Sequence, residues 1–443
     1  MHPQVNELAA LAPFFGTLAS FALLPGAAPR IWHRYMVRIS LFWVGLGLVL
    51  GAEAAGPAAA LTQLWHSGLV DFLPFIAVLM ALYTLGGGVL IAGGPWGRPG
   101  GNLLLLAAGT LLASAMGTIA ASLLLIHPLL SANAARREVR HLVLAFIFVV
   151  ANAGGALTPL GDPPLLIGFL RGVPFFWPLF NLAGPMLVVV LPVLALTFAI
   201  DWRLARREPV RPAERIRVRG GANLAMLGIF IAVLTVAGIV PGPKIAIGPA
   251  SLPAGQIAIT LTAIVFVAAS ERVTPRAIRA RNQFAWAPMR EIAILFFAIF
   301  ATIPPVLRTV TAAGLPQSAA GWFWASGLSS AFLDSGPTYL MFFEAAGGNA
   351  AQLIAPPATL LTSFAAGSVL FGGLTYLGNA PNLMIRAIAA RRGVRMPGFF
   401  GYMLAASAVL LPLFALMTLI FLNTSKQQTL LLRKQKSCFH YCQ

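Results

Sequence analysis

Two aspartates lie in strongly apolar stretches, where a carboxylate is costly. Asp162 falls in GALTPLGDPPLLI (155–167), and Asp334 falls in SSAFLDSGPTYL (329–340). A carboxylate inside a membrane costs about 2.5–3.5 kcal/mol on insertion scales, and such residues usually mark ion pathways or proton relays. Carboxylate oxygens are hard ligands that suit an alkali cation, and burial favours the protonated form of a carboxyl group. The pair therefore predicts a metal-ion site for Na⁺ that protons also occupy.

Polar and small residues around the two aspartates are candidates for shaping this site. They are Asn152, Thr158, Gly161, Ser335, Thr338, Thr375, Asn379 and Asn382. Simpler roles stay open for all of them. In the simpler interpretation, the one role of Asp162 is to cap the helix that follows it, and Asp334 is an ordinary turn aspartate. In the same interpretation, the one role of the threonines and asparagines is to satisfy backbone groups that a broken helix leaves free.

The composition is that of a polytopic membrane protein. The 443 residues are 58% hydrophobic and only 9% charged, whereas soluble domains carry roughly 25% charged residues. Runs such as 186–200 and 223–240 approach the roughly 20 apolar residues that a spanning helix needs. The net charge of +18 could suggest nucleic acid. Because the arginines fall in short loops between apolar runs, we expect no nucleic-acid partner.

Basic loops predict the topology. The arginine-rich segments are PRIWHRYMVR (29–38), NAARREVRH (133–141), WRLARREPVRPAERIRVR (202–219), ERVTPRAIRARNQ (271–283) and RAIAARRGVR (386–395). The positive-inside rule places all five in the cytoplasm. Segment 102–130 must then leave and re-enter on one side, since about thirty residues hardly make two full spans. This predicts a re-entrant hairpin, and segment 320–343 is its counterpart in the second half.

The two halves of the chain repeat each other in letters as well as in segment order. GALTPLGDPPLLI (155–167) aligns without gaps to GGLTYLGNAPNLM (372–384), which makes Asn379 the positional twin of Asp162. We therefore expect an all-α fold with two inverted-topology repeats, each with a re-entrant hairpin and an unwound transmembrane helix. The expected units are 1–201 (first repeat), 202–221 (basic cytoplasmic linker), 222–422 (second repeat) and 423–443 (basic tail).

The matching motifs also predict where the helices break. Interior proline removes a backbone donor and clashes with the preceding turn. In lipid, the freed groups are tolerated only inside protein or against a watery cavity. Two such breaks at corresponding positions of inverted halves point to a transporter's binding site. The breaks alone favour neither cations nor anions, because half-helices offer a negative C-terminus and a positive N-terminus.

Other ionisable groups are interpreted as peripheral. Arg171 and Glu344 stand at segment ends, where contact with headgroups or water is expected, and Asp201 ends its own segment in the same way. His127 is expected to be an interfacial histidine. The tail cysteines, Cys438 and Cys442, give only a weak metal signal, and no motif of a hydrolase, metalloprotease or nucleotide-binding enzyme is present. We therefore expect neither catalysis nor a cofactor.

Three motifs resemble the NhaD-like sodium/proton antiporters. They are NAGGALTPLGDPP, SSAFLDSGPTYL and YLGNAPNLMIRAIA, and the likeness spans most of residues 8–422. This family belongs to a superfamily that also holds arsenite efflux carriers and citrate and dicarboxylate carriers. The resemblance implies inverted repeats, commonly a homodimer, and ion-coupling acids at Asp162 and Asp334. The second hairpin reads Asp-Ser-Gly-Pro where relatives often show Asp-Asn-Ala-Pro, which bears on ion selectivity.

The primary hypothesis is a multi-pass secondary antiporter of the bacterial inner membrane that exchanges sodium or lithium for protons. Its partners are the cation, protons and the lipid bilayer. The alternative is a sodium-coupled carrier of organic anions such as citrate or dicarboxylates, with the same architecture. Fixed negative charge at Asp162 and Asp334 weighs against the anion carrier. A membrane scaffold or sensor is the third possibility, and it gives no reason for paired helix breaks.

Overall fold

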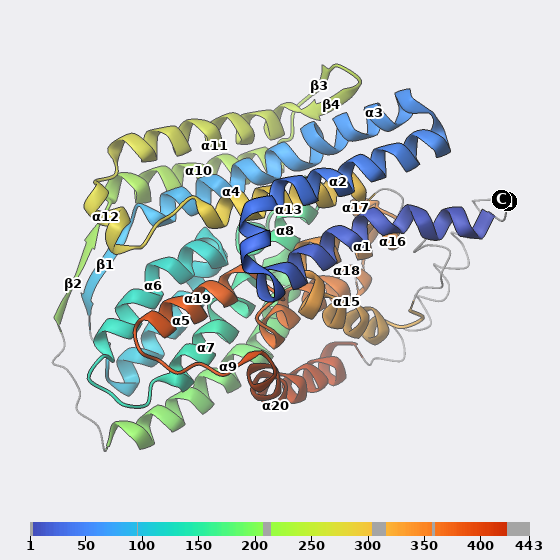
Figure 1. The fold of residues 1–443 in the computed structure, drawn as a ribbon. Coiled ribbons are helices and arrows are strands. Elements are labelled where there is room, and N and C mark those ends of the chain that lie inside the picture. The colour runs from blue at the N-terminus through green and yellow to red at the C-terminus, as the bar shows by residue number, and fades with distance from the viewer. Residues whose placement is uncertain (1–2, 95, 207–213, 304–315, 357–358, 423–443) are drawn as a thin grey trace.

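The computed structural model describes residues 3–94, 96–206, 214–303, 316–356 and 359–422, and these are mostly helical (Figure 1). The elements up to residue 205 are α1 (Pro3–Ala27), α2 (Pro29–Ala55), α3 (Pro57–His66), the π-helical turn η1 (Ser67–Phe72), α4 (Leu73–Gly87), β1 (Leu90–Gly94), α5 (Pro99–Met116), α6 (Thr118–Ala132), α7 (Arg140–Val149), the 3₁₀ turn η2 (Ala153–Leu157), α8 (Pro163–Leu170) and α9 (Trp177–Ala205). The tail at 423–443, with its cysteines, lies outside the described residues.

The second half follows a similar order. Its described elements are β2 (Glu214–Arg219), α10 (Gly221–Ile239), β3 (Lys244–Ile247), β4 (Ala250–Pro253), α11 (Ala254–Val273), α12 (Arg276–Arg281), α13 (Ala287–Thr302), α15 (Ala319–Leu333), α16 (Ser335–Ala345), α17 (Ala350–Leu353), α18 (Thr359–Leu370), the 3₁₀ turn η3 (Phe371–Leu374), α19 (Ala380–Arg391), α20 (Phe399–Met417) and the π turn η4 (Thr418–Leu422). In each half a helix pair precedes a broken helix, and a long helix follows.

Eight helices of the described chain are long and apolar enough to cross a membrane. The outer helices leave large apolar side chains exposed, as a lipid-facing surface requires, and Phe400 is 76% exposed and Leu404 74%. The protein is therefore a multi-pass membrane protein. Among the expected hairpin arms, α5 with 18 residues meets the length of a span, whereas α6 has only 15.

Two short antiparallel ribbons were not expected. β1 pairs with β2, and β3 pairs with β4. The stretch 214–219 falls in the expected basic linker (202–221), yet its backbone hydrogen-bonds to β1. The first residues of that linker, up to Ala205, continue α9. The strand follows from a period-2 alternation in which Ile216 and Val218 stand between arginines.

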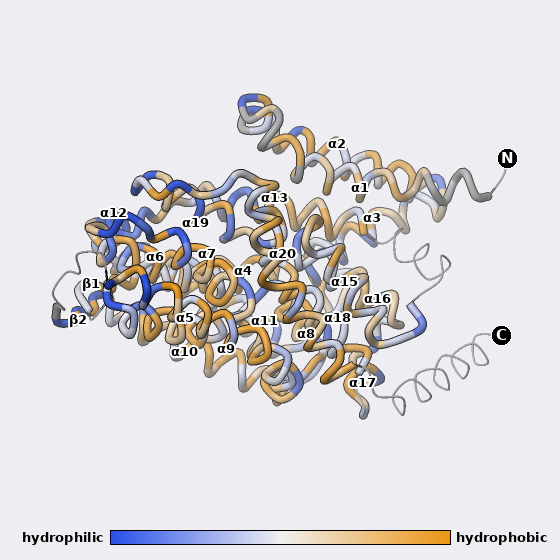
Figure 2. Tube along the Cα trace, turned by 90° about the horizontal axis from the view of Figure 1, so that it is seen from below, coloured by the Kyte–Doolittle hydropathy of each residue, from blue (hydrophilic) through white to orange (hydrophobic). Residues whose placement is uncertain are grey.

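Polar segments gather at one end of the molecule. Hydrophilic residues cluster around α12, β1 and β2 (Figure 2), and the β3–β4 ribbon lies at the opposite end (Figure 1). The start of α2, which carries the basic segment at 29–38, is set back from the end that holds β1 and β2 (Figure 1).

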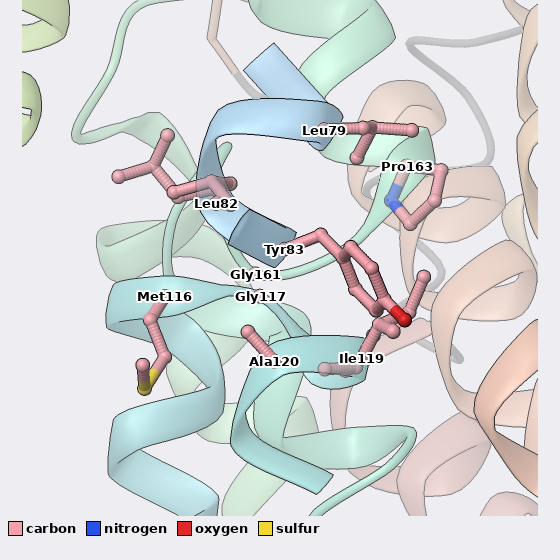
Figure 3. A pocket seen from close by; sticks show the side chains of 11 residues that line it. Leu79, Leu82, Tyr83, Met116, Gly117, Ile119, Ala120, Gly161 and Pro163 are labelled. Atoms are coloured by element: carbon pink, nitrogen blue, oxygen red, sulfur yellow. The ribbon is translucent and has the colours of Figure 1, made fainter. Parts of the chain in front are cut away.

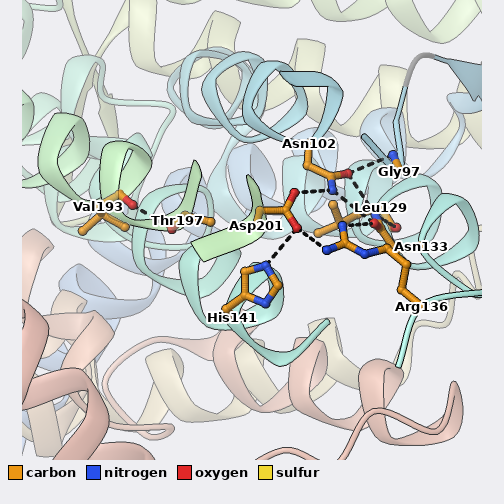
Figure 4. A network of polar contacts seen from close by, with 9 residues as sticks. All are labelled: Gly97, Asn102, Leu129, Asn133, Arg136, His141, Val193, Thr197 and Asp201. Atoms are coloured by element: carbon orange, nitrogen blue, oxygen red, sulfur yellow. Dashed lines mark hydrogen bonds and ion pairs between the residues drawn. The ribbon is translucent and has the colours of Figure 1, made fainter. Parts of the chain in front are cut away.

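A buried polar network fastens the basic end of the first half (Figure 4). Asp201, near the end of α9, is 1% exposed. Its Oδ1 lies 2.5 Å from Nη2 of Arg136 and 3.0 Å from Nε2 of His141, and its Oδ2 accepts a hydrogen bond from Asn102 at 2.9 Å. Asn133 joins Asn102 to Arg136. The expectation that Asp201 is a peripheral segment end is wrong, because this carboxylate ties α5, α7 and α9 together.

Asp201→Asn should strongly destabilise the protein. The substitution keeps the shape but removes the negative charge that Arg136 and His141 contact, and breaking a buried ion pair typically costs about 3–5 kcal/mol. The measurement is thermal unfolding in detergent. The matched control is Glu271→Gln, because Glu271 pairs with Arg279 at 2.9 Å but is 40% exposed, and such pairs contribute about 1 kcal/mol or less. Equal, small shifts in both variants would contradict this role for Asp201.

Candidate functional site

Both predicted helix breaks are present. The first separates α7 from α8 and contains η2 and an extended stretch that ends at Asp162. The second separates α18 from α19 and contains η3 and the stretch that ends at Asn379. Each half-helix after the break has proline in its first turn, where the missing amide hydrogen costs nothing. The glycine- and proline-rich motifs therefore act as the sequence predicted.

The two breaks are held by the same contacts. The Thr158 hydroxyl donates to the carbonyl of Ser114, and the Thr375 hydroxyl donates to the carbonyl of Ala331 at 2.5 Å. In both cases the partners are 44 residues apart, and each hydroxyl accepts from the amide two residues further on. The threonines thus satisfy freed backbone groups and connect each break to the helix pair that precedes it. That is the simpler of the two roles that were open for them.

Glycines let the backbone fold tightly onto itself at each break. A Cβ added to Gly161 would lie 2.1 Å from the carbonyl oxygen of Gly155, and one added to Gly378 would lie 2.7 Å from that of Gly372. Cβ atoms do not approach backbone oxygens so closely. Gly161 therefore serves the site through its missing side chain.

The two breaks meet in the interior. Asn379 donates from one amide nitrogen to Oδ1 of Asp162 at 3.0 Å and to the carbonyl of Ala151 at 3.1 Å. Asn152 in turn donates to Oδ1 of Asn382 at 2.9 Å. All of these side chains are at most 2% exposed. The asparagines are thus bridges between the halves, and Asn379 contacts the first carboxylate directly.

Asp162 is buried with one oxygen free. It is 2% exposed, and its Oδ1 accepts from Asn379 and, at 3.2 Å, from the hydroxyl of Thr118 at the start of α6. Its Oδ2 is buried and has no hydrogen-bond partner in the described structure. Although Asp162 occupies the N-cap position of α8, its side chain makes no capping bond. The capping interpretation therefore does not explain this carboxylate.

Asp334 forms the tip between α15 and α16. Its Oδ1 accepts from the amide of Gly336 at 3.2 Å and faces the hydroxyl of Ser335 at 3.5 Å, so it does cap α16. Thr338 donates to the Asp334 carbonyl rather than to the carboxylate. The backbone of Asp334 has φ 72° and ψ 149°, a region that non-glycine residues rarely adopt. The corresponding tip, Gly117, has nearly the same angles, φ 89° and ψ 144°.

The two carboxylates lie near each other because α8 packs against α16. A Cβ on Gly336 would lie 3.5 Å from the Cβ of Pro163. Asp162 and Asp334 interact electrostatically, and Ser335 lies beside both. Every hydrogen-bond partner that the described structure gives either carboxylate is neutral. The polar groups that the described structure gives this place are thus two carboxylates, the hydroxyls of Thr118 and Ser335, and N–H donors from Asn379 and Gly336.

A small pocket lies beside the first break (Figure 3). Its walls come from α4, from the turn between α5 and α6, and from the chain around Gly161. The lining residues are Leu79, Leu82, Tyr83, Met116, Gly117, Thr118, Ile119, Ala120, Leu160, Gly161 and Pro163. The pocket borders the backbone on either side of Asp162. It is mostly apolar, so it offers space next to the carboxylates rather than ligands.

Four ionisable residues lie in surroundings that the sequence did not predict. Arg171 was expected at headgroups, and the structure adds that it is paired, since it lies 2.5 Å from Oε1 of Glu344 and 3.0 Å from Oδ1 of Asp71. Glu344 is therefore also paired. Asp71 was not singled out, although it is a carboxylate inside an apolar run, which is the signal that identified Asp162. His127 was expected at the interface, but it is 6% exposed and both ring nitrogens are buried without a partner in the described structure.

Asn379→Ala should destabilise the protein and weaken the junction of the breaks. The change removes hydrogen bonds to Asp162 and to Ala151, and leaving such buried groups unsatisfied costs about 1–3 kcal/mol. Thermal unfolding of the purified protein measures this loss. Asn181→Ala is the control, because Asn181 donates only to Trp177 within its own helix. An equal effect of the two substitutions would contradict a bridging role for Asn379.

Comparison with known proteins gives the family. No curated protein matches the chain significantly. A family model, CitMHS_2, described as "Putative citrate transport", matches residues 4–422 and so covers both breaks and both helix pairs. The match supports the wider group of ion and citrate transporters that the motifs indicated, without specifying the NhaD-like antiporters. By this match over nearly its whole length, the chain belongs to the CitMHS_2 family.

Proposed function

We propose that this membrane transporter exchanges sodium, or lithium, for protons by competition at Asp162 and Asp334. One observation carries the proposal: the Asp162 carboxylate is buried where the two helix breaks meet, with one oxygen unpartnered and no basic group among its described hydrogen-bond partners. An isolated buried carboxylate is unfavourable unless it is protonated or paired with a cation. Either ion relieves the same cost, so each displaces the other.

The architecture that supports exchange is a pair of inverted repeats. α5–α6 and α15–α16 correspond as helix pairs, α7–α8 and α18–α19 correspond as broken helices, and the threonine contacts join them over the same 44-residue spacing. We assign the helix pairs as re-entrant hairpins whose tips, at Gly117 and Asp334, face the breaks. The units 1–201 and 222–422 are the repeats, and 202–221 links them on the cytoplasmic side.

Competition gives a simple cycle. With the carboxylates ionised, sodium binds to their oxygens together with neighbouring hydroxyl and amide oxygens. When protons replace the cation, each carboxyl group becomes neutral and no longer attracts sodium. The binding site itself thus couples the two fluxes. The protein would act in the bacterial inner membrane, as the homodimer that the resemblance implies, with no further cofactor.

A citrate or dicarboxylate carrier is the second candidate, and the family description favours it. α8 and α19 begin at the two breaks, and α16 begins at the tip that Asp334 forms. Helix N-termini attract anionic groups. A citrate bound directly at Asp162 and Asp334 would meet negative charge. In this candidate, therefore, a cation must lie between the substrate and the aspartates.

The decisive assay uses everted vesicles from cells that lack their own antiporters. Sodium should collapse an imposed pH gradient, and Asp162→Asn or Asp334→Asn should abolish that response, because neither variant offers a site that exchanges a proton for a cation. Glu53→Gln, at the exposed end of α2, should behave as the parent. Normal exchange in both site variants rules out the assigned site, and transport of citrate or succinate alone favours the second candidate.

Competition also predicts the pH dependence. As the pH falls through the range in which the carboxyl groups titrate, the sodium concentration for half-maximal exchange should rise by up to about tenfold per pH unit for each competing proton. The maximal rate at saturating sodium should change much less. Initial rates in proteoliposomes at several pH values measure both quantities. A fall in maximal rate with constant half-saturation would contradict a shared site.

A further inference from the structure

An ion-pair cluster lies at the opposite ends of the half-helices that carry the two acids. Arg171 directly follows α8, and its guanidinium contacts Glu344 of α16 at 2.5 Å and Asp71 of η1 at 3.0 Å. His66 at the end of α3 lies 3.6 Å from the other oxygen of Asp71. None of these residues has a role in the proposed ion exchange.

The contact between Arg171 and Glu344 joins two half-helices that already lie side by side. α8 begins at Asp162 and ends before Arg171, and α16 begins after Asp334 and holds Glu344 near its end. At 1.5 Å per residue, each charged end lies about 14–15 Å from its aspartate. The two half-helices thus form a unit, with the site at one end and this ion pair at the other.

The contact between Arg171 and Asp71 joins that unit to a different helix. Asp71 lies in a π-helical turn between α3 and α4, and such turns are rare and frequently occur at functional sites. α4 also forms one wall of the pocket beside the first break. Any change in the position of α8 and α16 relative to α4 must therefore break or stretch the bond between Arg171 and Asp71.

The exposure of the cluster indicates a contact that can open. The side chains of Arg171, Glu344 and Asp71 are 29%, 19% and 11% exposed. Water can therefore replace either carboxylate, and partly exposed pairs are worth about 0.2–1 kcal/mol. A bond of this strength biases a conformational equilibrium without locking it.

We propose that Arg171 is a positioning residue: through Asp71 it fastens the α8–α16 unit, and with it Asp162 and Asp334, to the α3–α4 helix, and this bond opens during the transport cycle. Its opening and closing changes which side of the α8–α16 unit the ion site faces. The part that concerns transport rests on the proposed function, whereas the fastening does not.

A distance measurement tests the fastening without any substrate. Spin labels are placed at Gln63 on α3 and Gln352 on α17, which are both exposed, in a background with Cys438→Ser and Cys442→Ser. α3 leads into the turn that holds Asp71, and α17 follows α16. Asp71→Asn should increase the population of longer distances about two- to five-fold, the factor that such a pair supports. Glu344→Gln and Glu53→Gln, which leave the bond to Asp71 in place, should give the distribution of the parent.

A transport measurement separates positioning from simple stabilisation. In Asp71→Asn, the sodium concentration for half-maximal exchange should change by a similar two- to five-fold factor, while the maximal rate per folded protein stays the same. If the ion pair only stabilised the fold, the substitution would lower the amount of folded protein and leave that concentration unchanged. An unchanged distance distribution in Asp71→Asn overturns the proposal. So does the same change in Glu53→Gln. If the parent exchanges no sodium but the distances respond, the proposed function fails and the fastening stands.

Discussion

The structure depends on satisfying backbone groups that two broken helices leave free in a membrane. Neither lipid nor distant water can pair with these groups, so each break must find partners in protein. The chain solves this by bringing the breaks together: Asn379 reaches the carbonyl of Ala151 in the other half, and Asn152 reaches Asn382. Thr158 and Thr375 connect the same breaks to the helix pairs. The polar centre is thus a structural necessity before it is a binding site.

The carboxylates are the part of this centre that structure alone does not require. An amide at position 162 could also accept from Thr118 and Asn379, and it would carry no charge. Asp162 instead keeps an unpartnered, buried oxygen, and the neighbouring Asp334 adds a second charge. Because uncompensated charge is unfavourable in such surroundings, the proposed function has this centre hold either a cation or protons. Burial away from water thus has two effects here: it raises the free energy of unpaired backbone groups at the breaks, and it raises the free energy of an unpaired carboxylate.

The sequence predicted the features that local chemistry determines. Glycine and proline act within a few residues, so the letters of 155–167 and 372–384 were enough to locate both breaks. Side-chain pairs between distant segments were not predictable in this way: Arg171 and Glu344 are 173 residues apart, and nothing near either residue indicates the other. Asp71 and the strand at 214–219 were missed for a different reason, because their signals, a charge in an apolar run and a period-2 alternation, are visible in the letters.

The two halves are asymmetric in where they place their carboxylates. The first half places its carboxylate at the break and glycine at the tip, whereas the second half places asparagine at the break and its carboxylate at the tip. Since α8 packs against α16, the two acids lie together, and their twins, Gly117 and Asn379, are neutral. The tip conformation suits glycine, and Asp334 adopts it at a cost of about 1–3 kcal/mol for such strained backbone. The Asp334 carboxylate also caps α16 through the amide of Gly336, which glycine could not do, and the proposed ion binding would give the same carboxylate a second role.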